Sequence, residues 1–154
     1  LVIAFSQVAE CHKDLLLVCT GGDFNASEMK LLQQYGVEDR VVHLFASESD
    51  VKNLYAFAKA FIYPSLYEGF GMPIIEANAT GRVLLTSKIT SIPEIAANTA
   101  HYINPYDVSS IRKGFQKLIS DDKYREKLIL RGIANAKRFT IKHITEEYEN
   151  IYNS

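Results

Sequence analysis

Residues 61–81 read FIYPSLYEGFGMPIIEANATG, and this stretch has the order of a strand, a loop and a helix. The apolar run FIY is short and ends at Pro64, which cannot donate a backbone hydrogen bond to a sheet. Pro73 is well suited to the first turn of a helix, and Gly81 is a natural terminator. The stretch therefore predicts one βα unit, with its helix over residues 73–80.

The same alternation continues on both sides of this unit. Short apolar runs predict further strands at residues 15–19, 41–45, 83–86 and 101–103. Asn25 and Ser47 are each followed three residues later by a carboxylate, which predicts a capped helix start at both positions. Gly36 lies where the first of these helices should end, and the pattern is helical from Val108 onward. Strands that alternate with helices predict an α/β domain around a parallel sheet.

The composition is that of one compact domain. The chain has 154 residues, of which 47% are hydrophobic and 23% charged, and its formal net charge of -1 argues against general nucleic-acid binding. Cys11 and Cys19 belong to no cluster of metal-ligand residues, so no zinc site is expected. No apolar run approaches the roughly 18 residues of a membrane-spanning helix, and no signal peptide is evident, so we expect a cytoplasmic protein.

The charge is unevenly distributed along the chain. Residues 1–110 carry 7 basic and 12 acidic side chains, whereas residues 111–154 carry 10 basic and 6 acidic ones. We expect the basic tail to be a solvated helix face, and the alternative is peripheral contact with anionic lipid at the inner face of a membrane. The chain opens inside an apolar run without an initiating Met, which suggests a fragment of a longer protein.

The loop between Pro64 and Pro73 carries the candidate site. Ligands of open parallel sheets bind outside the carboxyl ends of the strands, where a helix N-terminus offers free backbone N–H groups. Gly69 and Gly71 would let a polar ligand approach the main chain, and the carboxylates of Glu68 and Glu76 can accept hydrogen bonds from hydroxyl groups. This combination suits a nucleotide sugar, which has hydroxyls at both ends and phosphates between them.

The spacing from Glu68 to Glu76 in EGFGMPIIE resembles the E-x7-E motif of the retaining GT-B glycosyltransferases of family four, the glycosyl transferases group 1. The segments PSLY, SIPE and NPYD resemble the family's strand-end lead-in, its loop before a short helix and the turn before its C-terminal helices. The resemblance covers nearly the whole chain. It implies a Rossmann-like three-layer αβα domain, the C-terminal half of a GT-B fold, in which residues 1–154 bind the donor and lack both the N-terminal acceptor domain and the first strand of this domain.

The resemblance also implies roles for individual residues. Glu68 would contact the donor sugar near the reacting centre, as the catalytic residue, and Glu76 would bind the ribose hydroxyls. The base would meet the loop around Phe45 and Ala46. The full set of implied donor-binding residues is Gly69, Phe70, Gly71, Met72 and Glu76. The donor would be a UDP- or GDP-linked sugar, and no metal or other cofactor is expected because basic side chains and helix dipoles stabilise the departing diphosphate.

The implied reaction is retaining transfer of a hexosyl group to a hydroxyl acceptor, a glycan or a lipid-linked saccharide, in polysaccharide biosynthesis. The Arg and Lys that the family uses for the diphosphate would precede Leu1, and Arg82 stands where the family often has proline. The isolated chain is therefore expected to fold and bind donor weakly without transferring sugar. Alternatives are a nucleotide-sugar epimerase or phosphorylase of the same fold, and a non-catalytic nucleotide-binding module.

Other residues favour structural interpretations. GFGMPI departs from the dinucleotide-binding fingerprint because Ile74 replaces its third glycine, so NAD binding is not expected. The segment Gly21-Gly22-Asp23 is either a second main-chain contact or a plain turn, and Glu94 should stabilise a helix N-terminus rather than line the cleft. The four histidines lie on different predicted elements and are interpreted as structural or exposed: His12, His43, His101 and His143.

Overall fold

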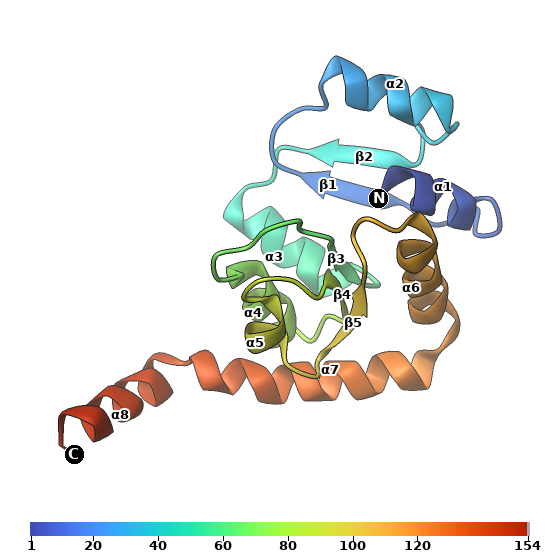
Figure 1. Cartoon of the computed structure of the whole chain (residues 1–154). Coiled ribbons are helices and arrows are strands. Elements are labelled where there is room, and N and C mark those ends of the chain that lie inside the picture. Colours follow the sequence, from blue (N-terminus) through green and yellow to red (C-terminus); the bar gives the residue numbers. More distant parts are fainter. Residues whose placement is uncertain (154) are drawn as a thin grey trace.

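A computed structural model describes residues 1–153, apart from the side chain of Glu147. Within these residues lie the strands β1 (Leu17–Thr20), β2 (Val41–Leu44), β3 (Phe61–Tyr63), β4 (Leu84–Ser87) and β5 (Ala100–Ile103). All of their pairings are parallel (Figure 1). Every strand expected from the sequence forms, with ends that shift by at most two residues, which confirms the α/β class.

Helices separate the strands as predicted, and one further helix, α1, which was not predicted from the sequence, precedes β1. They are α1 (Val2–Ala9), α2 (Ala26–Gln34), α3 (Glu48–Phe57), α4 (Met72–Ala79), α5 (Ile92–Ala96), α6 (Val108–Ser120), α7 (Asp122–Ala136), the 3-10 turn η1 (Lys137–Phe139) and α8 (Ile141–Tyr152). Both predicted capping boxes are confirmed, since the Asn25 and Ser47 side chains accept backbone N–H groups while Glu28 and Asp50 reach back to the cap residues. These local hydrogen bonds satisfy donors that a helix start otherwise leaves free.

The strands form two sheets, with the orders β1-β2 and β3-β4-β5, where the sequence had predicted one continuous sheet. All residues of β1 and all residues of β3 line one cavity of about 1070 Å³. β1 and β3 therefore lie on this cavity and are not joined by backbone hydrogen bonds. The expectation of an α/β domain with parallel strands is therefore confirmed, and within the described residues these strands lie in two sheets.

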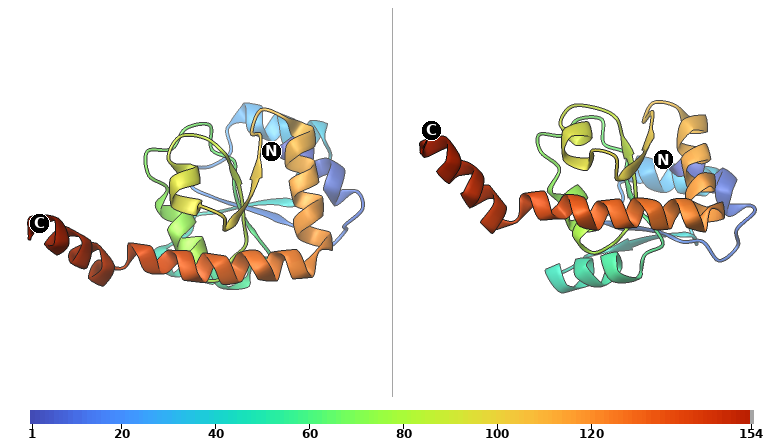
Figure 2. Two further views of the ribbon diagram at one scale, coloured as in Figure 1. Left: turned by 60° about the horizontal axis from the view of Figure 1, so that its bottom comes forward. Right: turned by 90° about the horizontal axis from the view of Figure 1, so that it is seen from below.

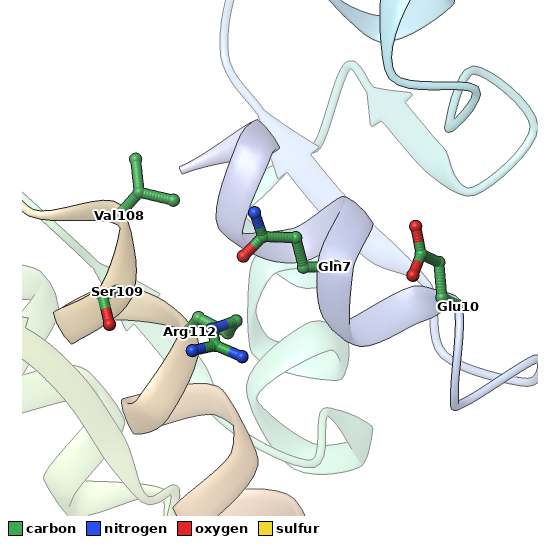
Figure 3. Close-up of a pocket in the computed structure, with 5 residues that line it drawn as sticks. All are labelled: Gln7, Glu10, Val108, Ser109 and Arg112. Atoms are coloured by element: carbon green, nitrogen blue, oxygen red, sulfur yellow. The ribbon is translucent and has the colours of Figure 1, made fainter.

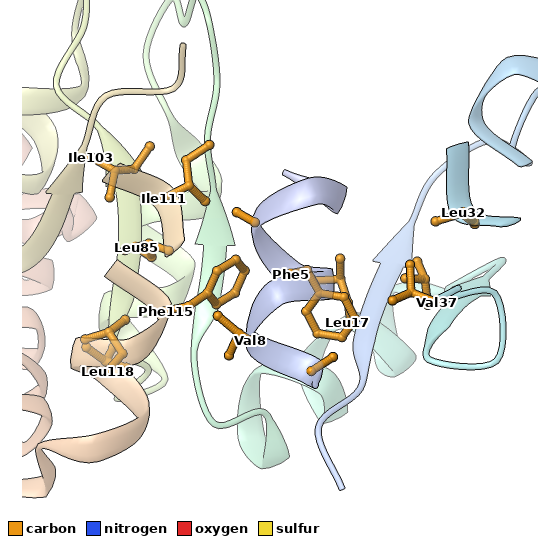
Figure 4. Close-up of a cluster of buried hydrophobic side chains, with 14 of the residues drawn as sticks. Phe5, Val8, Leu17, Leu32, Val37, Leu85, Ile103, Ile111, Phe115 and Leu118 are labelled. Carbon is orange, nitrogen blue, oxygen red and sulfur yellow. The ribbon is translucent and has the colours of Figure 1, made fainter. Parts of the chain in front are cut away.

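Side-chain packing joins the two sheets where backbone hydrogen bonds do not. Phe5 of α1 and Phe115 of α6 meet edge to face, with their ring centroids 6.2 Å apart. Leu17 of β1 and Leu85 of β4 belong to the same buried cluster (Figure 4). Because this cluster spans both sheets, α1 and α6 set how the two halves of the domain lie relative to each other.

Helix α7 crosses the domain and holds α4 in place (Figure 2). Gly132 of α7 lies so close to α4 that an added Cβ would be 2.7 Å from Asn78 Oδ1. Asn78 is only 1% exposed, and its Nδ2 donates a hydrogen bond to Thr99 Oγ1 at 3.2 Å. Helix α8 extends away from the body of the domain beyond α7 (Figure 2).

We expect Gly114→Ala to destabilise the domain although alanine is the better helix former. An added Cβ would lie 2.5 Å from Leu85 Cδ1 and 2.8 Å from Ile103 Cγ2, in a fully packed layer between α6 and the sheet. Overpacking should outweigh the gain of about 1 kcal/mol in helix propensity, so that the free energy of unfolding falls by about 1–2 kcal/mol.

Urea denaturation measures this difference. Gln116→Ala on the exposed side of the same helix is the matched control and should leave the midpoint nearly unchanged. An increase in stability for Gly114→Ala would contradict the packing described here.

Candidate functional site

The candidate site begins at the loop from Pro64 to Gly71, which joins β3 to α4 (Figure 1). Gly71 is the N-cap of α4 and has φ 106°, a conformation that side chains with a Cβ rarely adopt. Gly69 differs, because a Cβ added there would meet no atom within 4 Å. Gly71 is therefore required for the turn into the helix, whereas Gly69 leaves the main chain of the loop open to approach.

Side chains of the loop after β4 form hydrogen bonds with the backbone of this glycine loop. Thr90 Oγ1 accepts a hydrogen bond from the Glu68 N–H at 3.2 Å. The Ser91 hydroxyl donates to the Glu68 carbonyl, at 2.9 Å, and to the Phe70 carbonyl, at 3.2 Å. Thr90 has φ 44°, which is unusual for a β-branched residue and indicates local strain. Two loops at one sheet edge thus fix the main chain around Glu68.

Both glutamates of the predicted pair accept hydrogen bonds from tyrosines. The Tyr63 hydroxyl donates to Glu68 Oε2, and the Tyr55 hydroxyl donates to Glu76 Oε2 at 3.2 Å. The rings of Tyr55 and Phe61 have centroids 5.1 Å apart, and those of Phe61 and Tyr63 are stacked at 5.6 Å. An aromatic series therefore connects the two acidic side chains across β3.

The tyrosine hydroxyls remain protonated donors at neutral pH. Burial is the largest cause that raises the pKa of Tyr55, and the negative charge of Glu76 adds to it. Burial also raises the pKa of Tyr63, followed by its hydrogen bond to Glu68. Since both phenol pKa values move upward from an ordinary value near 10, neither group ionises in the physiological range.

The cavity of about 1070 Å³ brings part of the predicted site together. Glu76, Tyr55 and Tyr63 line it, and so do Phe45 and Ala46 from the loop that was expected to meet the base. Glu68 and the residues from Gly69 to Met72 are not among the lining residues, so Glu68 is linked to the cavity through Tyr63. The structure thus places Glu76 at the cavity and Glu68 outside its lining, and the prediction that both carboxylates face one ligand stays a prediction.

A second hollow lies between α1 and α6, away from the glycine loop. Its volume is about 510 Å³, and it is lined by Gln7, Glu10, Val108, Ser109 and Arg112 (Figure 3). Figure 3 shows the side chains of Gln7 and Arg112 on facing helices at an open surface. None of the residues that line this second hollow is a predicted site residue.

Several structural interpretations agree with the contacts. His43 lies between Asp23 Oδ1, at 3.2 Å from its Nδ1, and the Gly21 carbonyl, at 2.9 Å from its Nε2, so it ties the turn after β1 to β2. Burial lowers the pKa of His101, whose Nδ1 is 3.0 Å from the Tyr124 hydroxyl. Glu94 is exposed in the first turn of α5, and the segment predicted as a loop before that helix is its N-cap and first turn.

Sequence reasoning missed four residues that shape the site. Tyr55 lies on α3 with its ring buried, while its hydroxyl reaches Glu76. Tyr63 was assigned only to a strand, although its position one residue before Pro64 places it at the carboxyl end. The roles of Thr90 and Ser91 depend on pairing between β3 and β4, for which the sequence has no local signal.

In residues 1–153, no group of three or more His, Cys, Asp or Glu side chains is placed to hold a metal ion. Among the helices of the same residues, none combines the length and apolar character of a membrane-spanning segment.

Comparisons with known proteins give consistent results. The family described as glycosyl transferases group 1 matches residues 1–134. The O-antigen chain mannosyltransferase B of Escherichia coli is 38% identical over 108 residues, which are 70% of this chain and 28% of that protein. The chain thus spans little more than a quarter of the length of this relative.

Solved structures share the fold. WaaG, a glycosyltransferase involved in lipopolysaccharide biosynthesis, aligns with a TM-score of 0.80 at 21% identity over 97% of this chain and 41% of its own. HepE of Anabaena, solved in complex with UDP and glucose, aligns with a TM-score of 0.81 at 19% identity over 99% of this chain and 44% of its own. At this identity, the likeness concerns the fold.

The two glycines of the loop should respond differently to substitution. Gly71→Ala should lower the free energy of unfolding by about 1–3 kcal/mol, because alanine is strained at φ 106° and its Cβ would lie 3.0 Å from Ile74 Cδ1. Gly69→Ala, with open space around it, should change the stability by less than about 0.5 kcal/mol. Urea denaturation of both variants tests the difference, and equal losses would contradict it.

Proposed function

The chain belongs to the glycosyl transferases group 1 family, and from this premise we propose that it binds a nucleotide-sugar donor for retaining transfer of a hexosyl group to a hydroxyl acceptor. The observation that carries the proposal is the position of Glu76. Its carboxylate lies at a large cavity that the Phe45 loop also lines, and a tyrosine hydroxyl holds it there. A carboxylate in this place can accept both hydroxyl hydrogens of a ribose while the base lies against the loop after β2.

The diphosphate and the sugar would lie next to the glycine loop. A Cβ added at Gly69 would meet open space, and α4 begins directly after its N-cap Gly71, so the main chain and the positive end of the helix dipole face the same region. Glu68 would accept hydrogen bonds from the sugar hydroxyls near the anomeric carbon. In this proposal Met72, the exposed first residue of α4, and Phe70 border the donor, and no metal takes part.

The donor is proposed to be UDP- or GDP-linked. A relative named a mannosyltransferase makes mannose the first sugar to test, and a neighbour crystallised with UDP and glucose makes UDP a reasonable first nucleotide. The acceptor, a glycan or lipid-linked saccharide, would bind to a part of the enzyme outside this domain. The match covers 28% of the length of the mannosyltransferase relative, so most of that protein lies outside the matched region.

We also propose that the part of the cavity between β1 and β3 accommodates a further strand of this domain, whereas the part between Glu76 and the Phe45 loop receives the nucleoside. β1 and β3 both border it, and its lining includes the apolar residues Leu17, Val18, Phe61 and Ile62. A parallel strand between them would satisfy backbone groups of both strands and would convert two sheets into one. Its carboxyl end would then lie beside the glycine loop, where basic residues could neutralise a diphosphate.

Charge limits how the C-terminal helices could meet a membrane. Helix α7 carries Lys123, Lys127 and Arg131, whereas α8 combines exposed apolar residues with Glu146 and Glu149. Anionic lipid would repel these carboxylates. Peripheral membrane contact therefore stays a secondary proposal, and it would involve α7 rather than α8.

Replacement of Glu76 tests the nucleoside end of the site. Glu76→Ala should weaken binding of UDP or GDP by about 1–3 kcal/mol, because ribose hydroxyls lose their acceptor. Isothermal titration calorimetry measures the affinity. Glu126→Ala, which removes an exposed carboxylate from α7, is the control and should bind like the original chain. Unchanged affinity in Glu76→Ala would remove Glu76 from the site.

The isolated chain should not transfer sugar even where it binds donor. An acceptor site and further diphosphate ligands are expected to lie outside these residues, so the chemical step lacks its partner groups. Product analysis by mass spectrometry, with nucleotide-linked mannose and glucose and a panel of saccharide acceptors, tests this expectation. Turnover above the rate of spontaneous hydrolysis would contradict it.

A further inference from the structure

We propose that Tyr55 and Tyr63 are positioning residues, each of which orients one glutamate toward a different part of the donor. Tyr55 would orient Glu76 toward the nucleoside, and Tyr63 would orient Glu68 toward the sugar. This inference rests on the proposed function, since it assigns parts of a nucleotide sugar to the two pairs.

Within the described residues, the Tyr55 hydroxyl is the hydrogen-bond partner that holds the exposed Glu76 carboxylate in place. Its side chain is 7% exposed, so α3 and the neighbouring Phe61 ring fix the position of its hydroxyl. That hydroxyl is 3.2 Å from Glu76 Oε2 and 3.4 Å from the Pro73 carbonyl, and the charged and nearer acceptor is favoured. A flexible glutamate on a helix surface thereby acquires one orientation, and its second oxygen stays available to a ligand.

Glu68 is held in a similar way, from strand β3. The Tyr63 hydroxyl donates to Glu68 Oε2, while Oε1 lies 3.5 Å from the Phe70 N–H. Thr90 and Ser91 fix the backbone of the same residue. The carboxylate therefore has both a fixed Cα and a fixed oxygen, so its direction does not depend on bound ligand.

The two pairs occupy different places relative to the cavity. Tyr55, Tyr63 and Glu76 line it, whereas Glu68 lies beyond Tyr63 on the glycine loop. A nucleotide sugar whose nucleoside enters the cavity would meet the Tyr55–Glu76 pair along the nucleoside. Only the group beyond the diphosphate would reach the Tyr63–Glu68 pair. Loss of one hydroxyl should therefore affect one part of the donor and spare the other.

Tyrosine-to-phenylalanine variants separate orientation from packing. The rings of Tyr55, Phe61 and Tyr63 pack on one another through their faces and edges, and phenylalanine preserves these contacts. The variants lose only the hydrogen bonds of the hydroxyls, which also contact the Pro73 carbonyl at Tyr55 and Ser65 at Tyr63. Tyr152→Phe is the matched control, because its ring is exposed and α8, which carries it, extends away from the body of the domain (Figure 2).

The experiment is calorimetric titration of the chain and its variants with UDP, GDP and the corresponding nucleotide sugars. Tyr55→Phe should lower the affinity for the free nucleotide and for its sugar conjugate alike, by about 3- to 10-fold. Tyr63→Phe should lower the affinity for the sugar conjugate by a similar factor of about 3 to 10 and leave the free nucleotide unchanged. Tyr152→Phe should bind both ligands like the original chain.

Double variants distinguish positioning from a general structural role. In a Glu76→Ala background, Tyr55→Phe should cause no further loss, and in a Glu68→Ala background the same should hold for Tyr63→Phe. Urea midpoints of all variants establish that they fold. Additive losses in the double variants, or equal losses for both ligands in Tyr63→Phe, would overturn the inference while nucleotide binding itself stands. If the original chain binds neither nucleotides nor nucleotide sugars, the proposed function fails, and the positioning role fails with it.

Discussion

The candidate site depends on the parallel pairing of β3 with β4. Phe61 pairs with Leu84 and Tyr63 with Thr86, so both strands end at the same edge of the sheet. The loops that follow them must therefore meet, and the hydroxyls of Thr90 and Ser91 reach the backbone of Glu68. With antiparallel pairing, these loops would lie at opposite ends of the sheet. The short parallel register of β3 and β4 thus determines where the glutamate pair lies.

The two halves of the domain contribute different parts of the site. The β1-β2 sheet supplies the loop at Phe45, and the β3-β4-β5 sheet supplies the glycine loop with Glu68. No strand pairing connects these halves within the described residues, so the packing of Phe5 against Phe115 governs their spacing. The geometry across the cavity is consequently a property of the apolar core between α1 and α6 as much as of the polar residues at its edge.

The sequence predicts those features that have local causes. The capping boxes at Asn25 and Ser47 depend on residues three positions apart, and the end of β3 depends on Pro64, so both were predictable. The separation into two sheets was not predictable, because it depends on whether strands far apart in the chain pair with each other. The hydrogen bond from Tyr55 to Glu76 joins α3 to α4, and no spacing rule within a single element predicts such a contact. The glutamate pair was identified by its motif, whereas the groups that orient it required the tertiary structure.

The close contact between Gly132 and Asn78 links the basic C-terminal segment of the chain to the helix that carries Glu76. Helix α7 has no residue at the cavity, yet it sets the position of α4 because only a hydrogen atom fits between Gly132 and the buried amide. A larger residue at position 132 would therefore have to displace the Asn78 side chain or be matched by a smaller residue at position 78. These two sites should therefore covary among descendants of this sequence, although neither would touch a substrate.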